Sequence, residues 1–235
     1  TWMGRWLDAQ RLDGPGPAGS GAGAGTSGHE AHGGHAAPRL PAVAVRQAMA
    51  ASVAEANLAI FDASQAQAAY RGMGTTLVLA VFIGGRLFIG HIGDSRAYRW
   101  RGGQLEQLTR DHSLLQEQLD AGLITPAQAA LSTHRNLVTR ALGIEPTVAL
   151  ETHEHTVLPG DCLLLCSDGL TDMVPDAEIA EILAQPWPPA RLAAALVARA
   201  NERGGRDNVS VLLAQAAPGD PPFHAHAHAH AHEPN

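Results

Sequence analysis

The chain has no lysine, so all 16 of its basic residues are arginine, and 23 acidic residues bring the net charge to −7. We attribute the missing lysine to a GC-rich genome rather than to function. Domains that bind nucleic acid usually carry a basic patch. The negative balance therefore argues against a nucleic-acid partner.

Long apolar runs are also missing. The longest apolar stretch, residues 75–92, is interrupted by Gly84, Gly85 and Arg86, and it is too short to cross a bilayer. The first residues lead into no apolar core of the signal-peptide kind. We therefore expect a cytoplasmic protein that is not associated with a membrane.

Cysteine is scarce, since Cys162 and Cys166 are the only two. They flank a run of three leucines, and the alternation of a β-strand would put both on one face. Disulfides are rare in cytosolic proteins. We expect two ordinary buried thiols rather than a disulfide or a metal pair.

Composition divides the chain into three parts. Residues 1–40 are rich in Gly and Ala, and residues 216–235 are Pro-rich before His and Ala alternate from His224 to His232. Neither part should hold a packed core, and both are expected to be disordered. The tail histidines could bind Ni²⁺, Zn²⁺ or Cu²⁺, although repeat slippage is the simpler explanation. Residues 41–215 show the periodicity of one folded domain.

Within that domain, apolar spacings of three and four predict a helix that begins near Pro41. Residues 75–108 resemble an antiparallel meander of four strands, with Gly pairs at the hairpin turns. Further elements are expected as strands at 162–166 and 209–213 and as helices at 113–121, from 125, at 176–184 and at 188–204. This order favours an α+β fold in which helices pack outside antiparallel sheets.

Several aspartates lie just after a strand or beside a glycine, namely Asp94, Asp168, Asp172 and Asp207. Carboxylates brought together would repel one another unless a cation neutralised them. Oxygen ligands suit hard ions such as Mg²⁺ or Mn²⁺. The alternative is that each aspartate only forms a turn or caps a helix, and the pattern alone leaves both interpretations open.

Six short motifs resemble, in their order, those of the metal-dependent protein serine/threonine phosphatases, the type 2C or PPM family, in its bacterial form. The resemblance covers roughly residues 33–214. The motifs are Gly72-Met73-Gly74-Thr75-Thr76, Gly93-Asp94-Ser95-Arg96-Ala97-Tyr98, Thr109-Arg110-Asp111-His112-Ser113, Asn136-Leu137-Val138-Thr139-Arg140-Ala141-Leu142-Gly143, Leu165-Cys166-Ser167-Asp168-Gly169-Leu170-Thr171-Asp172 and Gly204-Gly205-Arg206-Asp207-Asn208-Val209-Ser210-Val211.

The resemblance implies a four-layer α-β-β-α fold, an antiparallel β-sandwich flanked by helices, which would here be incomplete at its N-terminal strands. It also implies two Mn²⁺ or Mg²⁺ ions whose shared water attacks the phosphate, so no side chain is the nucleophile. Asp168 and Asp207 would be metal ligands, while Asp94 and Asp172 would support a weaker third ion. The segment from Ser113 to about Arg135 matches a flap beside the active site.

The implied function is hydrolysis of phosphoserine and phosphothreonine on proteins, by a monomer that opposes a Ser/Thr protein kinase in the cytoplasm. The alternative is a catalytically impaired pseudophosphatase that binds phosphoproteins or a kinase. Neither the substrate protein nor the substrate-binding residues follow from the motifs. His91 is expected to be a packed core histidine, and His112 a hydrogen-bonding residue next to the flap.

Two family motifs have no good match near the N-terminus. An Arg followed by Asn-Glu-Asp is missing, and the metal loop Asp-Gly-Met-Gly-Gly-His is matched best by Glu30-Ala31-His32-Gly33-Gly34-His35. In a degenerate metal loop Glu30 and His35 would be the ligand candidates. We favour a shifted reading frame or wrong start over a degenerate enzyme, because the downstream aspartates are intact. The chain as written is then expected to bind Mn²⁺ weakly and to hydrolyse p-nitrophenyl phosphate slowly.

Overall fold

The computed structural model describes residues 40–130, 132 and 137–216. The chain divides into two units, Thr1–Leu40 and Pro41–Asn235, and everything below concerns the second. The expectations for the Gly/Ala-rich segment, for Glu30 and His35 and for the His-Ala tail lie outside the described residues. Across the described ranges, no helix combines the length and the apolar character that crossing a membrane requires.

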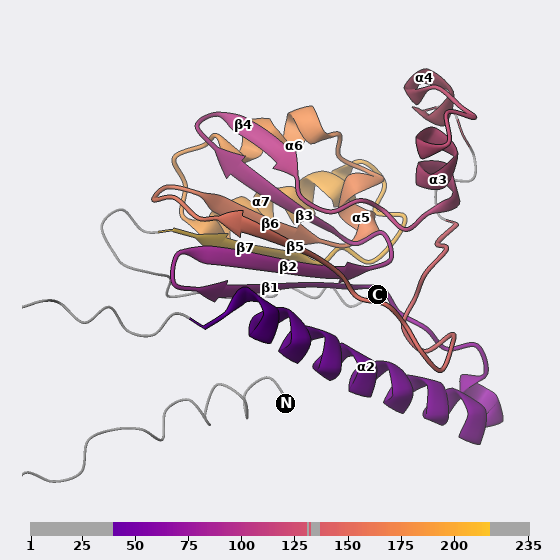
Figure 1. Ribbon diagram of the computed structural model, residues 1–235. Coiled ribbons are helices and arrows are strands. Elements are labelled where there is room, and N and C mark those ends of the chain that lie inside the picture. The colour runs from indigo at the N-terminus through magenta and orange to yellow at the C-terminus, as the bar shows by residue number, and fades with distance from the viewer. Residues whose placement is uncertain (1–39, 131, 133–136, 217–235) are drawn as a thin grey trace, which may run out of the picture. The chain divides into compact units, whose positions relative to one another are not determined.

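Two antiparallel sheets form the centre of the molecule (Figure 1). The three-stranded sheet has the order β1-β2-β5, and the four-stranded sheet has the order β4-β3-β6-β7. Helix α2 runs along the three-stranded sheet, whereas α5, α6 and α7 lie on the side of the four-stranded sheet (Figure 1). The α+β sandwich with outer helices is thus confirmed. The strands are β1 (Leu77–Ile83), β2 (Arg86–Ile92), β3 (Arg96–Arg101), β4 (Gln104–Gln107), β5 (Glu151–Thr156), β6 (Cys162–Cys166) and β7 (Val211–Gln215).

The helices follow the sequence pattern closely. Ser113 caps one of them by accepting a hydrogen bond from the Gln116 backbone N–H at 3.2 Å, and Thr125 does the same for Gln128 at 3.3 Å. Asp176 is the first residue of its helix, and it accepts a hydrogen bond from the Tyr98 hydroxyl at 3.0 Å. The helices are α2 (Ala42–Ala66), the 3-10 turn η1 (Ala68–Tyr70), α3 (Leu114–Asp120), α4 (Pro126–Ala130), α5 (Asp168–Thr171), α6 (Asp176–Leu183) and α7 (Pro189–Glu202).

Successive side chains of a strand point to opposite faces of its sheet, and this alternation separates the core into layers. Leu87 and Ile89 of β2 pack between the two sheets with Leu163 of β6. Ile92, at the end of β2, instead packs with Val53 of α2. The largest cluster lies between the four-stranded sheet and its helices and contains Tyr98, Cys162, Leu164, Cys166, Leu170, Ile179 and Leu196.

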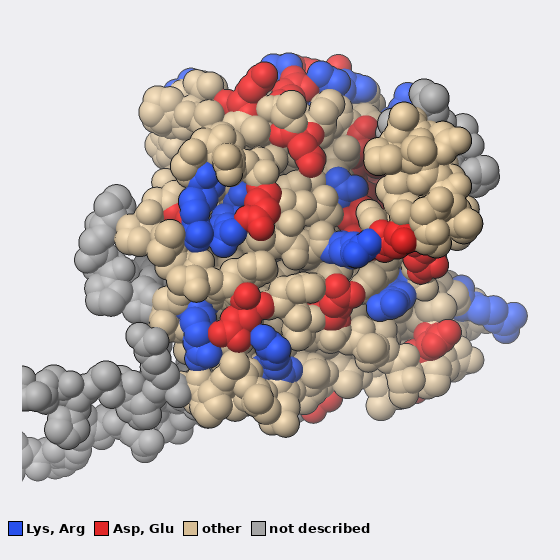
Figure 2. Space-filling view, turned by 45° about the horizontal axis from the view of Figure 1, so that its top comes forward, with Lys and Arg blue, Asp and Glu red and all other residues tan. Residues whose placement is uncertain are grey.

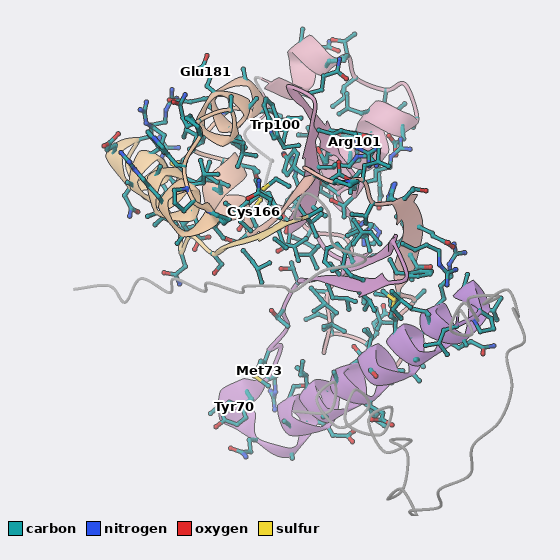
Figure 3. All side chains as sticks on the ribbon, turned by 90° about the vertical axis from the view of Figure 1, so that its left-hand side faces the viewer. Tyr70, Met73, Trp100, Arg101, Cys166 and Glu181 are labelled. Atoms are coloured by element: carbon teal, nitrogen blue, oxygen red, sulfur yellow. The ribbon has the colours of Figure 1, made fainter. Side chains whose placement is uncertain are left out.

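Both cysteines are buried, free thiols in that last layer, as the sequence predicted. Figure 3 shows Cys166 between the four-stranded sheet and the helices. Burial raises the pKa of Cys162 to about 11 and that of Cys166 to about 12. Because the thiolate is the reactive form, these groups are chemically inert packing residues.

The meander predicted for residues 75–108 is wrong at its middle connection. The hairpins β1–β2 and β3–β4 form as expected, but β2 and β3 belong to different sheets. The chain crosses between the sheets at Gly93, where φ is +98° and a Cβ would lie 2.4 Å from Cγ2 of Thr76. Glycine is the residue that tolerates this conformation and this approach. Turn residues identify each hairpin but do not say whether two hairpins share a sheet.

Strand β5 is absent from the sequence-based prediction. Its residues, Glu-Thr-His-Glu-His-Thr, are all polar, so they show no apolar alternation. The strand forms because it pairs antiparallel with β2, from Arg86 opposite Thr156 to His91 opposite Glu151. This tertiary pairing brings Glu151 and His153 into a cluster of imidazoles that is described below.

The outer strands leave apolar edges. Within the described residues, β1 pairs with β2 alone and β7 with β6 alone. All seven residues of β1, Leu-Val-Leu-Ala-Val-Phe-Ile, are partly exposed. A long apolar edge is a template for pairing with another strand. In the described part of the chain, the outer edges of β1 and β7 are therefore open to pairing with a further strand.

Candidate active site

The aspartate site is built by the register of the four-stranded sheet. Strand β6 is antiparallel to both neighbours, so its last residue, Cys166, lies opposite Arg96 at the start of β3 and Val211 at the start of β7. The chain that leaves β6 therefore meets the chains that enter β3 and β7 at one edge of the sheet. Asp168 begins α5 directly after β6, and Asp94 and Asp207 lie in the connections that enter β3 and β7.

The Ser-Asp-Gly and Asp-Asn motifs are locked together at this edge. A Cβ on Gly169 would lie 2.4 Å from the Asn208 carbonyl oxygen, so only glycine allows the two segments to approach this closely. The Ser167 hydroxyl donates to the same carbonyl at 3.1 Å and accepts the Ser210 backbone N–H at 3.0 Å. These contacts hold the Asp207 segment beside Asp168.

A cleft of about 520 Å³ opens between the sheet edge and the α3–α4 segment. Asp94, Asp168 and Asp172 line it, together with Asp111 and Asp176. Asp207 is not among the lining residues, although its charge acts on Asp168. Figure 2 shows acidic side chains in the hollow beside the α3–α4 segment. Three of the four aspartates singled out in the sequence thus share one cleft.

Two carboxyl groups of the cleft have raised pKa values. Burial raises the pKa of Asp94 to about 6, with further contributions from the charges of Asp168, Asp111 and Asp172. Burial also raises the pKa of Asp168, helped by the charges of Asp207 and Asp172. Ionising these groups together is costly, and a divalent cation with a preference for oxygen ligands would remove that cost. The donor set thus fits Mg²⁺ or Mn²⁺.

The raised pKa of Asp94 makes a prediction about the metal-free protein. Folding lifts this pKa from 3.8 to about 6, so the folded state prefers the protonated carboxyl. Protonation of Asp94 therefore stabilises the folded state fully below about pH 4, and this stabilisation is lost as the pH rises through about 6. In EDTA, Asp94→Asn is expected to be more stable than wild type by about 1 kcal/mol at about pH 7.5, after a discount for solvent screening.

Urea denaturation at about pH 4 and about pH 7.5 measures this difference, which should vanish at the lower pH, where the wild-type carboxyl is protonated. A variant that is less stable than wild type at the higher pH would show that ionised Asp94 is stabilising in the free protein.

Arg96 is the only basic residue among the described residues that line the cleft. Its Nε lies 2.9 Å from Oδ1 of Asp111 and its Nη2 lies 2.6 Å from Oδ2. Its Nη1 also donates to the Tyr98 hydroxyl at 3.0 Å. Because Arg96 is held in this bidentate pair, it is committed to the wall of the cleft. Sequence reasoning assigned no role to this pair, although both residues lie in the quoted motifs.

The histidine predictions are confirmed. His91 is fully buried in β2. His112 is a hydrogen-bonding residue, since its Nδ1 accepts the Gly93 backbone N–H at 3.2 Å and its Nε2 bonds Glu151 at 3.0 Å. Arg140 is exposed, and no ion pair of Arg140 is found among the described residues.

The first and fourth motifs have a structural role. Thr75 pairs with Leu142, and the Gly143 backbone N–H donates to Asn57 of α2 at 2.8 Å. Figure 3 shows Tyr70 and Met73 beyond the end of α2, away from the side chains of β3. These two motifs therefore join α2 to the three-stranded sheet rather than contribute ligands to the cleft.

Comparison with known proteins places this geometry in context. The family model described as protein phosphatase 2C matches residues 18–202, which begins earlier than the motif-based estimate of about Gly33. The serine/threonine phosphatase stp of Listeria monocytogenes is 40% identical over 164 residues, which are 70% of this chain and 65% of that protein. The chain thus spans slightly less than two thirds of that relative. The phosphatase PstP of Mycobacterium tuberculosis is 42% identical over 167 residues, 70% of this chain and 32% of that protein.

Solved structures agree with the fold. The serine/threonine phosphatase of S. agalactiae superimposes with a TM-score of 0.70 at 35% identity, covering 74% of this chain and 71% of that one. The catalytic domain of the phosphatase PstP, solved in complex with two manganese ions, gives a TM-score of 0.64 at 40% identity, covering 70% of this chain and 68% of that one.

Proposed function

The chain belongs to the protein phosphatase 2C family, and on that premise we propose that it hydrolyses phosphoserine and phosphothreonine on proteins. The observation that carries the proposal is the convergence of Asp94, Asp168 and Asp172 in one cleft. The relatives at 40% and 42% identity are named serine/threonine phosphatases. No observation favours the binding-only alternative over this one.

Proteins of this family depend on divalent metal ions, and one relative was solved in complex with two manganese ions. We propose that Asp168 and Asp207 would hold two Mn²⁺ or Mg²⁺ ions, and that Asp94 and Asp172 would support a third. The raised pKa values of Asp94 and Asp168 support this assignment, because the cleft concentrates negative charge that a cation would neutralise. When bound, the ions supply a nucleophilic water and neutralise charge on the phosphate.

The remaining lining residues would shape access to the cleft. Ser113, Leu115, Gln116 and Leu119 of the α3 segment form one wall opposite the aspartates. A wall of mixed polar and apolar side chains can hold a peptide beside the reacting phosphate and limit the entry of bulk water. The Arg96–Asp111 pair holds its part of the cleft wall in place. We propose that this wall contributes to the choice of substrate.

The proposed substrates require a source of phosphorylated serine and threonine. A Ser/Thr protein kinase is the class of enzyme that produces them, so such a kinase is the proposed functional counterpart. We propose that the chain acts on these products in the cytoplasm, as a monomer.

Phosphate release from a phosphothreonine peptide and from the matching phosphotyrosine peptide tests the function. With Mn²⁺ we expect measurable release from the first peptide, much slower release from the second, and none from either in EDTA. The turnover is expected to be slow, because the Arg that precedes Asn-Glu-Asp in the family has no match in the sequence, and Arg96 in the cleft is paired with Asp111. Equal rates on both peptides, or release that persists in EDTA, would contradict the proposal.

A further inference from the structure

A second cluster of metal-ligating side chains lies outside the aspartate cleft. His91 of β2 is paired in register with Glu151 of β5, and cross-strand partners share a face of the sheet. The period of two adds His153 and His155 to that face. The ring centroid of His91 lies 4.6 Å from that of His112 and 6.1 Å from that of His153. Imidazoles from three segments thus surround one carboxylate.

His91 has a buried ring nitrogen without a hydrogen-bond partner among the described residues. Its Nε2 lies 2.7 Å from the Arg110 carbonyl oxygen, which can only accept, so Nε2 carries the proton. Nδ1 therefore holds a lone pair, and it has no hydrogen-bond partner although the side chain is 0% exposed. Buried acceptors are rarely left unpaired, because the unmet desolvation is costly. An imidazole fixed by a carbonyl at one nitrogen is also the usual arrangement of a metal-binding histidine.

Glu151 is prepared to act as a ligand as well. Its Oε2 accepts from Nε2 of His112 at 3.0 Å and its Oε1 bonds Nε2 of His153 at 2.9 Å. Burial alone would raise the pKa of Glu151, but these hydrogen bonds outweigh it and hold the pKa at about 2. Burial lowers the pKa of His91. The carboxylate is therefore ionised and the buried imidazole neutral, which are the forms that bind metal.

We propose that His91, Glu151 and His153 form a binding site for a borderline divalent cation such as Zn²⁺. One ligand atom from each lies within 4.8 Å of the other two. Two nitrogens and one carboxylate oxygen are the ligands of many three-residue zinc sites, in which the fourth position stays open.

The site needs only small movements to close on an ion. Zinc bonds of about 2.0–2.2 Å require the ligand atoms to lie within roughly 4 Å of one another. The side chains of Glu151 and His153 are 34% and 39% exposed, so they can rotate, while His91 is fixed by packing. Because the Glu151 carboxylate can only accept, Nε2 of His153 carries the proton of this hydrogen bond. To bind the ion, the His153 ring would turn and present the unprotonated Nδ1, or Nε2 would release its proton to solvent. His112 can keep its bond to Oε2 of Glu151.

This site differs in chemistry from the aspartate cleft. Mg²⁺ prefers oxygen ligands and avoids imidazole, whereas Zn²⁺ accepts nitrogen readily. Saturating the cleft with Mg²⁺ therefore leaves the histidine site available to Zn²⁺. The histidines of the tail are a competing sink, so the test removes them by the substitutions His224→Ser, His226→Ser, His228→Ser, His230→Ser and His232→Ser in the otherwise full chain.

Equilibrium dialysis against Zn²⁺ with excess Mg²⁺ measures the site. The tail-substituted chain is expected to bind one more Zn²⁺ per chain than the same chain with His153→Gln or Glu151→Gln, each of which should weaken this site by about 100-fold or more. His155→Gln is the matched control, because it removes an imidazole from the same face of β5 outside the three ligands. Both Glu151 and His153 are partly exposed, so their variants should fold, which circular dichroism checks.

Replacing Zn²⁺ by Co²⁺ provides a second measurement. Binding to the histidine site should produce a visible absorption band of low-symmetry Co²⁺ that His153→Gln removes and His155→Gln retains. Equal Zn²⁺ binding by the tail-substituted chain and its His153→Gln variant, or an equal loss in His155→Gln, would overturn the proposal. Neither measurement uses phosphate release, so the result is independent of the proposed phosphatase activity.

Discussion

Asp168→Asn is expected to lower kcat/KM for Mn²⁺-dependent hydrolysis of a phosphothreonine peptide by at least about 100-fold. Removing groups that only orient metal ligands already costs about 10–100-fold in other enzymes, so losing a proposed ligand should cost more. The substitution keeps the size of the side chain and removes its charge. Initial rates measured over a range of Mn²⁺ concentrations determine whether higher metal restores activity.

Asp176→Asn is the matched control for this experiment. Asp176 lines the same cleft, but its Oδ1 accepts a hydrogen bond from the Tyr98 hydroxyl, and the amide oxygen of asparagine can still accept it. We expect Asp176→Asn to retain activity within about threefold, because no ligand is lost. If both variants lose activity equally, general loss of negative charge in the cleft would explain the effect, and the specific role of Asp168 would be wrong.

Gly93→Ala is expected to destabilise the fold strongly. Gly93 has a φ of +98°, and an added Cβ would lie 2.4 Å from Cγ2 and 2.7 Å from Cβ of Thr76. The left-handed conformation costs an alanine about 1–2 kcal/mol, and overpacking adds about 1–3 kcal/mol. The total of about 2–5 kcal/mol is a large part of the stability of an ordinary domain. Urea denaturation and the thermal midpoint measure it.

Gly103→Ala separates the two contributions. Gly103 has a similar φ of +85° in the β3–β4 turn, but nothing lies within 4 Å of an added Cβ. This variant should lose only the conformational part, about 1–2 kcal/mol. Equal losses in the two variants would show that Thr76 moves aside easily and that packing does not determine the crossing between the sheets.

The sequence alone determined the elements with strong local signals. The helix that begins near Pro41, the two hairpins and the helices that start near residues 113 and 125 follow from apolar spacing and glycine turns. These features depend on residues within a few positions of one another along the chain, so they can be predicted from the sequence alone. The order of the six motifs along the chain also indicated the family.

Only the tertiary structure decided which strands are neighbours. The period of two says which residues of a strand share a face, but not which sheet the strand joins. The crossing at Gly93 and the pairing of β5 with β2 depend on contacts between distant segments. The register at Cys166 brings Asp94 and Asp168 together for the same reason. The sequence therefore singled out the four aspartates, whereas long-range pairing created the aspartate cleft and placed His91 opposite Glu151.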